Sequence, residues 1–233
     1  MTRSAIGLST AMKRNTIVTL LSFNGGFVDT VGFLGLQGLF LAHVTGNFVT
    51  LGATMALGTH GAAAKILALP EFIAFVALAR VIGSTMRARN LPAMRILLGA
   101  KVALLFVFLV LAVRLGPFPD SDSPAALMTG FAGIAAMAIQ NAVQRVHLAS
   151  LPTTTLMTGN TAQVTLDAID LLQGVAGDQA DVVRARLTRT LRGLAAFAAG
   201  CAAAAGLYTV VGFWCVAVPV TVGALGVIIP IED

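Results

Sequence analysis

Long apolar runs are the feature that most limits how this chain can fold. Six runs come close to the ~20 residues that an α-helix needs to cross the hydrocarbon core of a bilayer: Thr16–Leu36, Ile66–Met86, Ile96–Leu115, Ala125–Gln144, Gly193–Val211 and Phe213–Pro230. Inside a bilayer the backbone must satisfy its own hydrogen bonds, which leaves only helices and closed barrels. We therefore predict an all-α polytopic membrane protein.

The composition agrees and excludes other classes. Hydrophobic residues make up 57% of the chain and charged residues 11%, whereas soluble domains are about 25% charged. The net charge of +5 does not indicate a nucleic-acid partner, because the basic residues lie at the ends of apolar runs, as in cytoplasmic loops. Cys201 and Cys215 lie within apolar runs and are interpreted as small buried hydrophobes. We expect a lipid bilayer as the surrounding, with no cofactor and no metal.

A tripeptide recurs at about half the length of the chain. Thr-Gly-Asn stands at 45–47 and again at 158–160, 113 residues later (158 − 45) in a chain of 233. Asp29 lies 16 residues before the first copy, and Asn141 lies 17 before the second. Internal repetition on this scale predicts two related halves. We divide the chain into a cytoplasmic segment (1–15), a first membrane repeat (16–115), an acidic external loop (116–124) and a second membrane repeat (125–233).

Each tripeptide lies in an apolar but interrupted segment, Gln37–Leu57 or Leu148–Leu172, which either crosses the membrane or dips in and returns. The positive-inside rule distinguishes the two arrangements. If both segments return, eleven basic residues are cytoplasmic and two are external, whereas crossing gives nine against four. The distribution favours re-entry, with crossing as the alternative.

Re-entry determines the relation between the halves. Each half would hold three full spans, an odd number, so the halves would be inverted repeats with both termini in the cytoplasm. Inverted repeats build many transporters, which bind substrate near the midplane where the repeats meet. An even number of spans would give parallel repeats instead.

The interrupted segments predict a polar site. Threonine is a suitable N-cap, glycine permits close approach, and the asparagine amide would lie beside a helix N-terminus that favours anions. Two such termini meeting at the centre favour a small anion or a small polar solute. The predicted substrate-binding residues are Thr45, Gly46, Asn47, Thr158, Gly159, Asn160, Asn141, Gln140 and Asn24. The alternative is that these side chains only bond the two breaks together.

Among single residues, Asp29 is the strongest candidate for a functional role. It lies well inside the first run, with Gly25 and Gly32 on the same helical face. An ionisable side chain at that depth is costly and marks a pathway or proton relay. We predict such a relay at Asp29 with His43, just before the first break, although His43 could instead be a loop-packing residue. Asp167 and Asp170 are expected to be solvated or paired with the Arg184–Arg192 cluster.

Two stretches carry a resemblance to a known family. These are GGFVDTVGFLGLQGLFLAHVTGNFVTLG at 25–52 and AMAIQNAVQR followed by TTTLMTGNTAQ at 136–163. In these two stretches the chain resembles the YoaK-like family of bacterial inner-membrane proteins, whose domain has no known function. Methionine often precedes the first Thr-Gly-Asn of that family, where Val44 stands here. The resemblance implies a multi-pass protein of the bacterial inner membrane and supplies no substrate.

The function predicted from these features is a membrane transporter or channel, and a non-transporting scaffold or assembly protein is the alternative. An enzyme is not expected, because the spans hold no paired catalytic aspartates, no His-Glu-x-x-His and no Ser/His constellation. Small-residue runs such as LAAFAAGCAAAAGL at 194–207 let helices approach closely. They would serve packing within one chain or, in the other interpretation, a homodimer.

Overall fold

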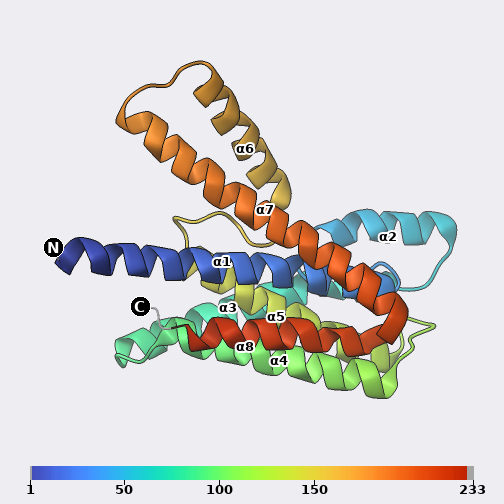
Figure 1. Ribbon diagram of the computed structural model, residues 1–233. Coiled ribbons are helices and arrows are strands. Elements are labelled where there is room, and N and C mark those ends of the chain that lie inside the picture. Colours follow the sequence, from blue (N-terminus) through green and yellow to red (C-terminus); the bar gives the residue numbers. More distant parts are fainter. Residues whose placement is uncertain (1, 230–233) are drawn as a thin grey trace.

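The computed structural model describes residues 2–229, with side chains from Met12 onward. Every regular element in this range is helical, as predicted (Figure 1). The elements are α1 (Thr2–Gly35), α2 (Gly46–Leu57), α3 (Ala62–Ala88), α4 (Ala93–Leu115), α5 (Pro124–His147), α6 (Met157–Leu172), α7 (Asp178–Val211), the 3-10 helix η1 (Gly212–Val216) and α8 (Ala217–Ile228).

Five stretches of the described residues are long and apolar enough to cross a membrane. They are Met12–Gly35, Ala62–Ala88, Ala93–Leu115, Pro124–His147 and Asp178–Ile228. The last has 51 residues and contains α7, η1 and α8, which fold back on one another after Gly212 (Figure 1). Gly212 has a φ of 55°, a left-handed conformation that suits glycine. The turn lies at the predicted junction, but the predicted run Phe213–Pro230 begins with η1, and its Pro230 lies outside the described residues.

Glycines set the closest helix packing in the bundle. A Cβ on Gly26 of α1 would lie 2.2 Å from the carbonyl oxygen of Phe197 in α7, and one on Gly200 would lie 2.2 Å from that of Phe23. The backbones of α1 and α7 therefore touch, as small residues allow in membrane helices. Further along both helices, Gly35 of α1 meets Tyr208 of α7, so the two helices run in the same direction.

The rest of the bundle forms around α5, the most buried of the candidate spans. Helix α5 packs against α3 and α4, while α8 packs against α4 and α1. The buried apolar side chains of α1, α4 and α5, with those of segment 36–45, form the main core. This core holds the site described below between α1 and α5.

The two short helices differ from each other. Helix α2 packs on α3, and α6 packs on α7. Helix α6 and the first half of α7 project away from the bundle (Figure 1). Among the short helices within residues 2–229, α2 is apolar enough for a membrane interior and α6 is not. The two predicted repeats are therefore unequal in polarity.

An ion pair joins α6 to α7. The Asp167 side chain is 0% exposed, and its two oxygens accept from Arg186 Nε at 3.0 Å each, while Arg186 Nη2 lies 2.5 Å from Oδ1. Gln163 donates to the same carboxylate at 2.7 Å. The hydrogen bonds from Arg186 lower the pKa of Asp167 from its ordinary value of 3.8. The predicted pairing with the arginine cluster is thus confirmed for Asp167.

This pair predicts an acid-sensitive junction. A carboxylate with a lowered pKa in the folded state stabilises the fold above its ordinary pKa of 3.8, and the contribution is lost as pH falls through the lower folded-state pKa. We expect the unfolding temperature in detergent to be higher for the wild type than for Asp167→Asn at pH 6, with the difference shrinking below about pH 4. A difference that stays constant between pH 6 and pH 3 would contradict the assignment.

Candidate functional site

The carboxylate of Asp29 holds the irregular segment 36–45 that separates α1 from α2. Asp29 Oδ1 accepts backbone N–H groups of Leu41, Ala42 and His43 at 2.8, 2.7 and 3.2 Å, and Oδ2 also accepts from His43 at 3.2 Å. Leu41 is 0% and Ala42 4% exposed, so these donors lie inside the protein. Asp29 therefore accepts three backbone N–H groups that lie outside any helix and away from solvent.

Amide side chains of α5 hold the equivalent segment 148–156 before α6. Asn141 Nδ2 donates to Thr155 Oγ1 at 3.3 Å, and Gln140 Nε2 donates to Thr154 Oγ1 at 3.1 Å. Gln140 also donates to the carbonyl oxygen of Leu21 in α1 at 2.9 Å. Asn141 thus occupies the place of Asp29 in the second half, with one weaker bond where Asp29 has four.

The two repeated asparagines bond the equivalent residue in both halves. Asn47 is 1% exposed, and its amide donates to the carbonyl oxygen of Phe40 at 2.9 Å and accepts from Phe40 N at 2.8 Å. Asn160 is 7% exposed, donates to the carbonyl oxygen of Thr153 at 2.8 Å and accepts from Thr153 Oγ1 at 3.2 Å. Each asparagine therefore ties the first turn of its short helix to the residue seven positions earlier.

The threonines of the repeat do not cap the short helices as predicted, and the two glycines differ in their surroundings. Thr45 occupies the N-cap position of α2 but is helical (φ −68°, ψ −20°) and makes no side-chain cap, because that conformation turns the hydroxyl away from the first-turn N–H groups. Thr158 lies one residue inside α6, which begins at Met157, and is exposed. A Cβ on Gly46 would meet the Phe40 ring at 2.9 Å, whereas one on Gly159 would meet nothing within 4 Å.

Both irregular segments lie between α1 and α5. A Cβ on Gly32 of α1 would lie 2.5 Å from Leu41 Cγ, and one on Gly133 of α5 would lie 2.7 Å from Leu41 Cδ1. Toward the other end of α1, a Cβ on Gly25 would lie 2.5 Å from the carbonyl oxygen of Thr154. Glycine is required at these positions because backbone and leucine side chains fill the space of a Cβ.

The two ends of segment 37–61 lie together. Lys65 Nζ, at the start of α3, donates to the carbonyl oxygen of Gln37 at 3.0 Å and to Thr54 Oγ1 at 2.9 Å. Asp122, in the acidic loop 116–124, accepts the backbone N–H groups of Gly61 and Ala64 at 3.0 Å each. The segment therefore leaves and rejoins the bundle at the end where the acidic loop lies.

His43 contacts both Asp29 and Phe40. Its backbone N–H bonds Asp29, and its ring lies 5.9 Å from the ring of Phe40. Within residues 2–229 no three His, Cys, Asp or Glu side chains gather in a way that could hold a metal ion.

Several buried polar atoms remain without partners among the described residues. Asn24 Nδ2 donates to the carbonyl oxygen of Pro219 at 3.0 Å, which leaves Asn24 Oδ1 unpaired, and Gln140 Oε1 and Lys101 Nζ are also unpaired. Asn24, Gln140 and Lys101 are 0% exposed. Lys101 was missed in the sequence, although a lysine inside the predicted run Ile96–Leu115 is itself a signal of function.

This fold defines an α-helical, multi-pass membrane protein with polar segments anchored inside its bundle. Residues 17–229 match the family described as protein of unknown function (DUF1275), and the chain belongs to that family. It is also similar to the UPF0700 transmembrane protein YoaK of Bacillus subtilis (strain 168), 36% identical over 69 residues, which are 30% of each chain. No solved structure matches the chain.

Asp29 and Asn141, which hold the two irregular segments, should contribute unequally to the free energy of unfolding. Asp29→Ala would leave three buried N–H groups unpaired and should destabilise the fold by about 3 kcal/mol or more, whereas Asn141→Ala removes one long bond and should cost about 1 kcal/mol. Asp29→Asn retains Oδ1 and should fall between the two. Thermal unfolding in detergent and amide hydrogen exchange at Leu41–His43 would measure this. Equal losses for Asp29→Ala and Asn141→Ala would contradict the anchoring role.

Proposed function

We propose that this protein transports a small anion or small polar solute across the bacterial inner membrane, along a path between two inverted halves. The supporting observation is the pair of irregular segments, 36–45 and 148–156, inserted between α1 and α5. In membrane proteins, backbone outside helices persists at depth only where protein buries it or it lines a watery cavity. In transporters, such interrupted helices form the substrate site.

Helix directions and contacts support the inverted relation. Gln140, late in α5, bonds the carbonyl oxygen of Leu21 in α1, whereas a Cβ on Gly130, early in α5, would lie 3.5 Å from Leu36, which directly follows α1; the two helices are therefore antiparallel. Helix α7 packs on α1, and α3 packs on α5 as the counterpart pair would. Helix α2 packs on α3 as α6 does on α7, and α4 packs on α5 as α8 does on α1. The packing partners of each helix in the first half therefore correspond to those of its counterpart in the second half. Under this proposal the Thr-Gly-Asn segments frame the path, and the unpaired oxygens of Asn24 and Gln140 face the solute.

A non-transporting scaffold is the second candidate, and a specific observation favours it. The hydrogen-bonding groups of Asp29, Asn47 and Asn160 are engaged by their own segments. A site occupied in this way supports a structural role. Flux measurements separate the two candidates.

Flux should depend on Asn47 and Asn160, which tie each irregular segment to its short helix. In liposomes containing the purified protein, a screen of small anions and polar solutes should show flux that Asn47→Ala and Asn160→Ala reduce by about tenfold, since a displaced segment disturbs the path. Thr161→Ala, beside Asn160 but exposed, is the matched control. If Asp29 relays protons, Asp29→Asn should alter the pH dependence of this flux. Absence of flux for every solute would favour the scaffold.

Re-entry of the first segment is tested by sidedness. We propose cytoplasmic termini and an external acidic loop, which place His60 outside the cell. A cysteine at exposed His60, in a chain with Cys201 and Cys215 replaced by alanine, should react with a membrane-impermeant maleimide on intact spheroplasts. Gly61 is unsuitable because its φ is 98° and a Cβ would lie 2.4 Å from Ser121 Oγ. Labelling only after lysis would support a crossing segment.

A further inference from the structure

Lys101 is a buried lysine whose amine finds no partner in the described part of the chain. It lies near the middle of α4, is 0% exposed, and its Nζ has no hydrogen-bond partner among residues 2–229. A buried ammonium without a partner is costly, and within a membrane helix such a group marks a substrate or ion pathway. The position calls for a ligand that supplies negative charge.

Polar groups of α1 lie beside this stretch of α4, across from α8. A Cβ on Gly223 of α8 would lie 3.0 Å from Val102 Cγ2 and 3.3 Å from Asn24 Nδ2. The residue next to Lys101 thus approaches Asn24 where the three helices meet. Asn24 Oδ1 at this meeting point is also buried and unpaired. The interior here has more hydrogen-bonding groups than it satisfies.

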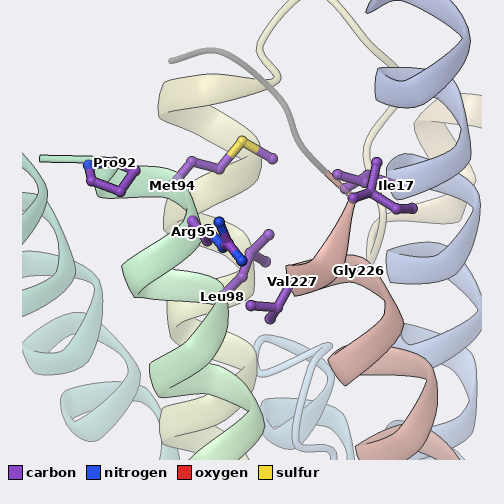
Figure 2. A pocket seen from close by; sticks show the side chains of 8 residues that line it. Ile17, Pro92, Met94, Arg95, Leu98, Gly226 and Val227 are labelled. Atoms are coloured by element: carbon purple, nitrogen blue, oxygen red, sulfur yellow. The ribbon is translucent and has the colours of Figure 1, made fainter.

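A cavity of about 110 Å³ opens one helical turn away from this point. Its walls come from α1, α4, α8 and the residues that flank the last two helices: Ile17, Pro92, Met94, Arg95, Leu98, Gly226, Val227 and Ile229. Leu98 precedes Lys101 by one turn on the same face of α4, and Gly226 follows Gly223 by one turn on α8. Figure 2 shows Arg95 of α4 in the space facing α8, beside Val227. The cavity therefore has the Arg95 guanidinium in its wall, and Lys101, which does not itself line the cavity, lies one turn deeper on the same face of α4.

We propose that this cavity binds a small organic carboxylate, whose charge is taken by Lys101 and whose short alkyl chain packs on the apolar walls. Because a carboxylate carries negative charge and accepts hydrogen bonds, it satisfies the Lys101 ammonium, which a neutral alkyl compound cannot. The inference rests on the proposed function in that it names the class of solute. None of the cavity-lining residues belongs to the site predicted from Thr-Gly-Asn.

Binding of propionate to the full-length protein in nanodiscs, measured by calorimetric titration, tests the proposal with propionamide as the uncharged analogue. Wild-type protein should bind propionate and not propionamide. Lys101→Met keeps the side-chain length, removes the charge and should weaken propionate binding by about tenfold or more. Its thermal stability should be unchanged or higher, because an unpaired buried ammonium is replaced by an apolar group.

Lys65→Met is the matched control. Lys65 is also a buried lysine, 3% exposed, but it has two partners, Gln37 and Thr54. Its replacement should lower the unfolding temperature and leave propionate affinity unchanged. The two lysine variants therefore separate loss of a ligand from loss of a structural contact.

A second variant fills the cavity while Lys101 stays in place. A Cβ on Gly226 would meet no atom within 4 Å, so Gly226→Leu enters open space and should abolish propionate binding. Gly206→Leu on α7, equally unobstructed, is its control.

Three outcomes would overturn the carboxylate site: no propionate binding by the wild type, equal binding of propionamide, or unchanged affinity in both Lys101→Met and Gly226→Leu. Binding that depends on Lys101 without any flux in liposomes would retain this site and refute the transport proposal. Flux that persists unchanged in Lys101→Met would retain transport and refute this site.

Discussion

The structure depends on how it satisfies backbone N–H groups in a place where water is scarce. Segment 36–45 leaves α1 inside the bundle, and its donors at Leu41, Ala42 and His43 are met by the Asp29 carboxylate. A membrane interior permits such a segment only where protein buries it or where it lines a watery cavity, and here protein groups bond these donors. One acidic side chain thereby allows a helix to stop, turn and begin again without exposing its backbone to lipid.

The second half solves the same problem with neutral groups. Asn141 and Gln140 reach threonine hydroxyls where Asp29 reaches backbone N–H groups, and Asn160 repeats the contact that Asn47 makes. Neutral amides have lower desolvation costs and form weaker bonds than a carboxylate. The half containing Asp29 therefore has the more firmly held segment, and the half containing Asn141 has the one that is easier to displace.

Much of this arrangement could be predicted from the sequence, and the reasons are physical. Apolar runs of bilayer length predicted the helices, and the matched spacing of Asp29 and Asn141 to the repeated tripeptide indicated that the two are counterparts. The partners of Asn47 and Asn160 could not be predicted, because a contact seven residues away depends on the path of the intervening turn. The expected threonine caps were wrong because Thr45 is already helical and Thr158 lies inside α6. Lys101 could have been found from its position alone.

Helix α7 has 34 residues and is about 51 Å long, well beyond the ~30 Å of a hydrocarbon core. Its first part carries four arginines, Arg184, Arg186, Arg189 and Arg192, and is braced by α6 through Asp167. Transfer of this arginine-rich part of α7 across the hydrocarbon core would cost several kcal/mol for each guanidinium. This cost acts against translocation of this part of α7, which predicts that the protein inserts in one preferred orientation and presents different surfaces to the two sides of the membrane.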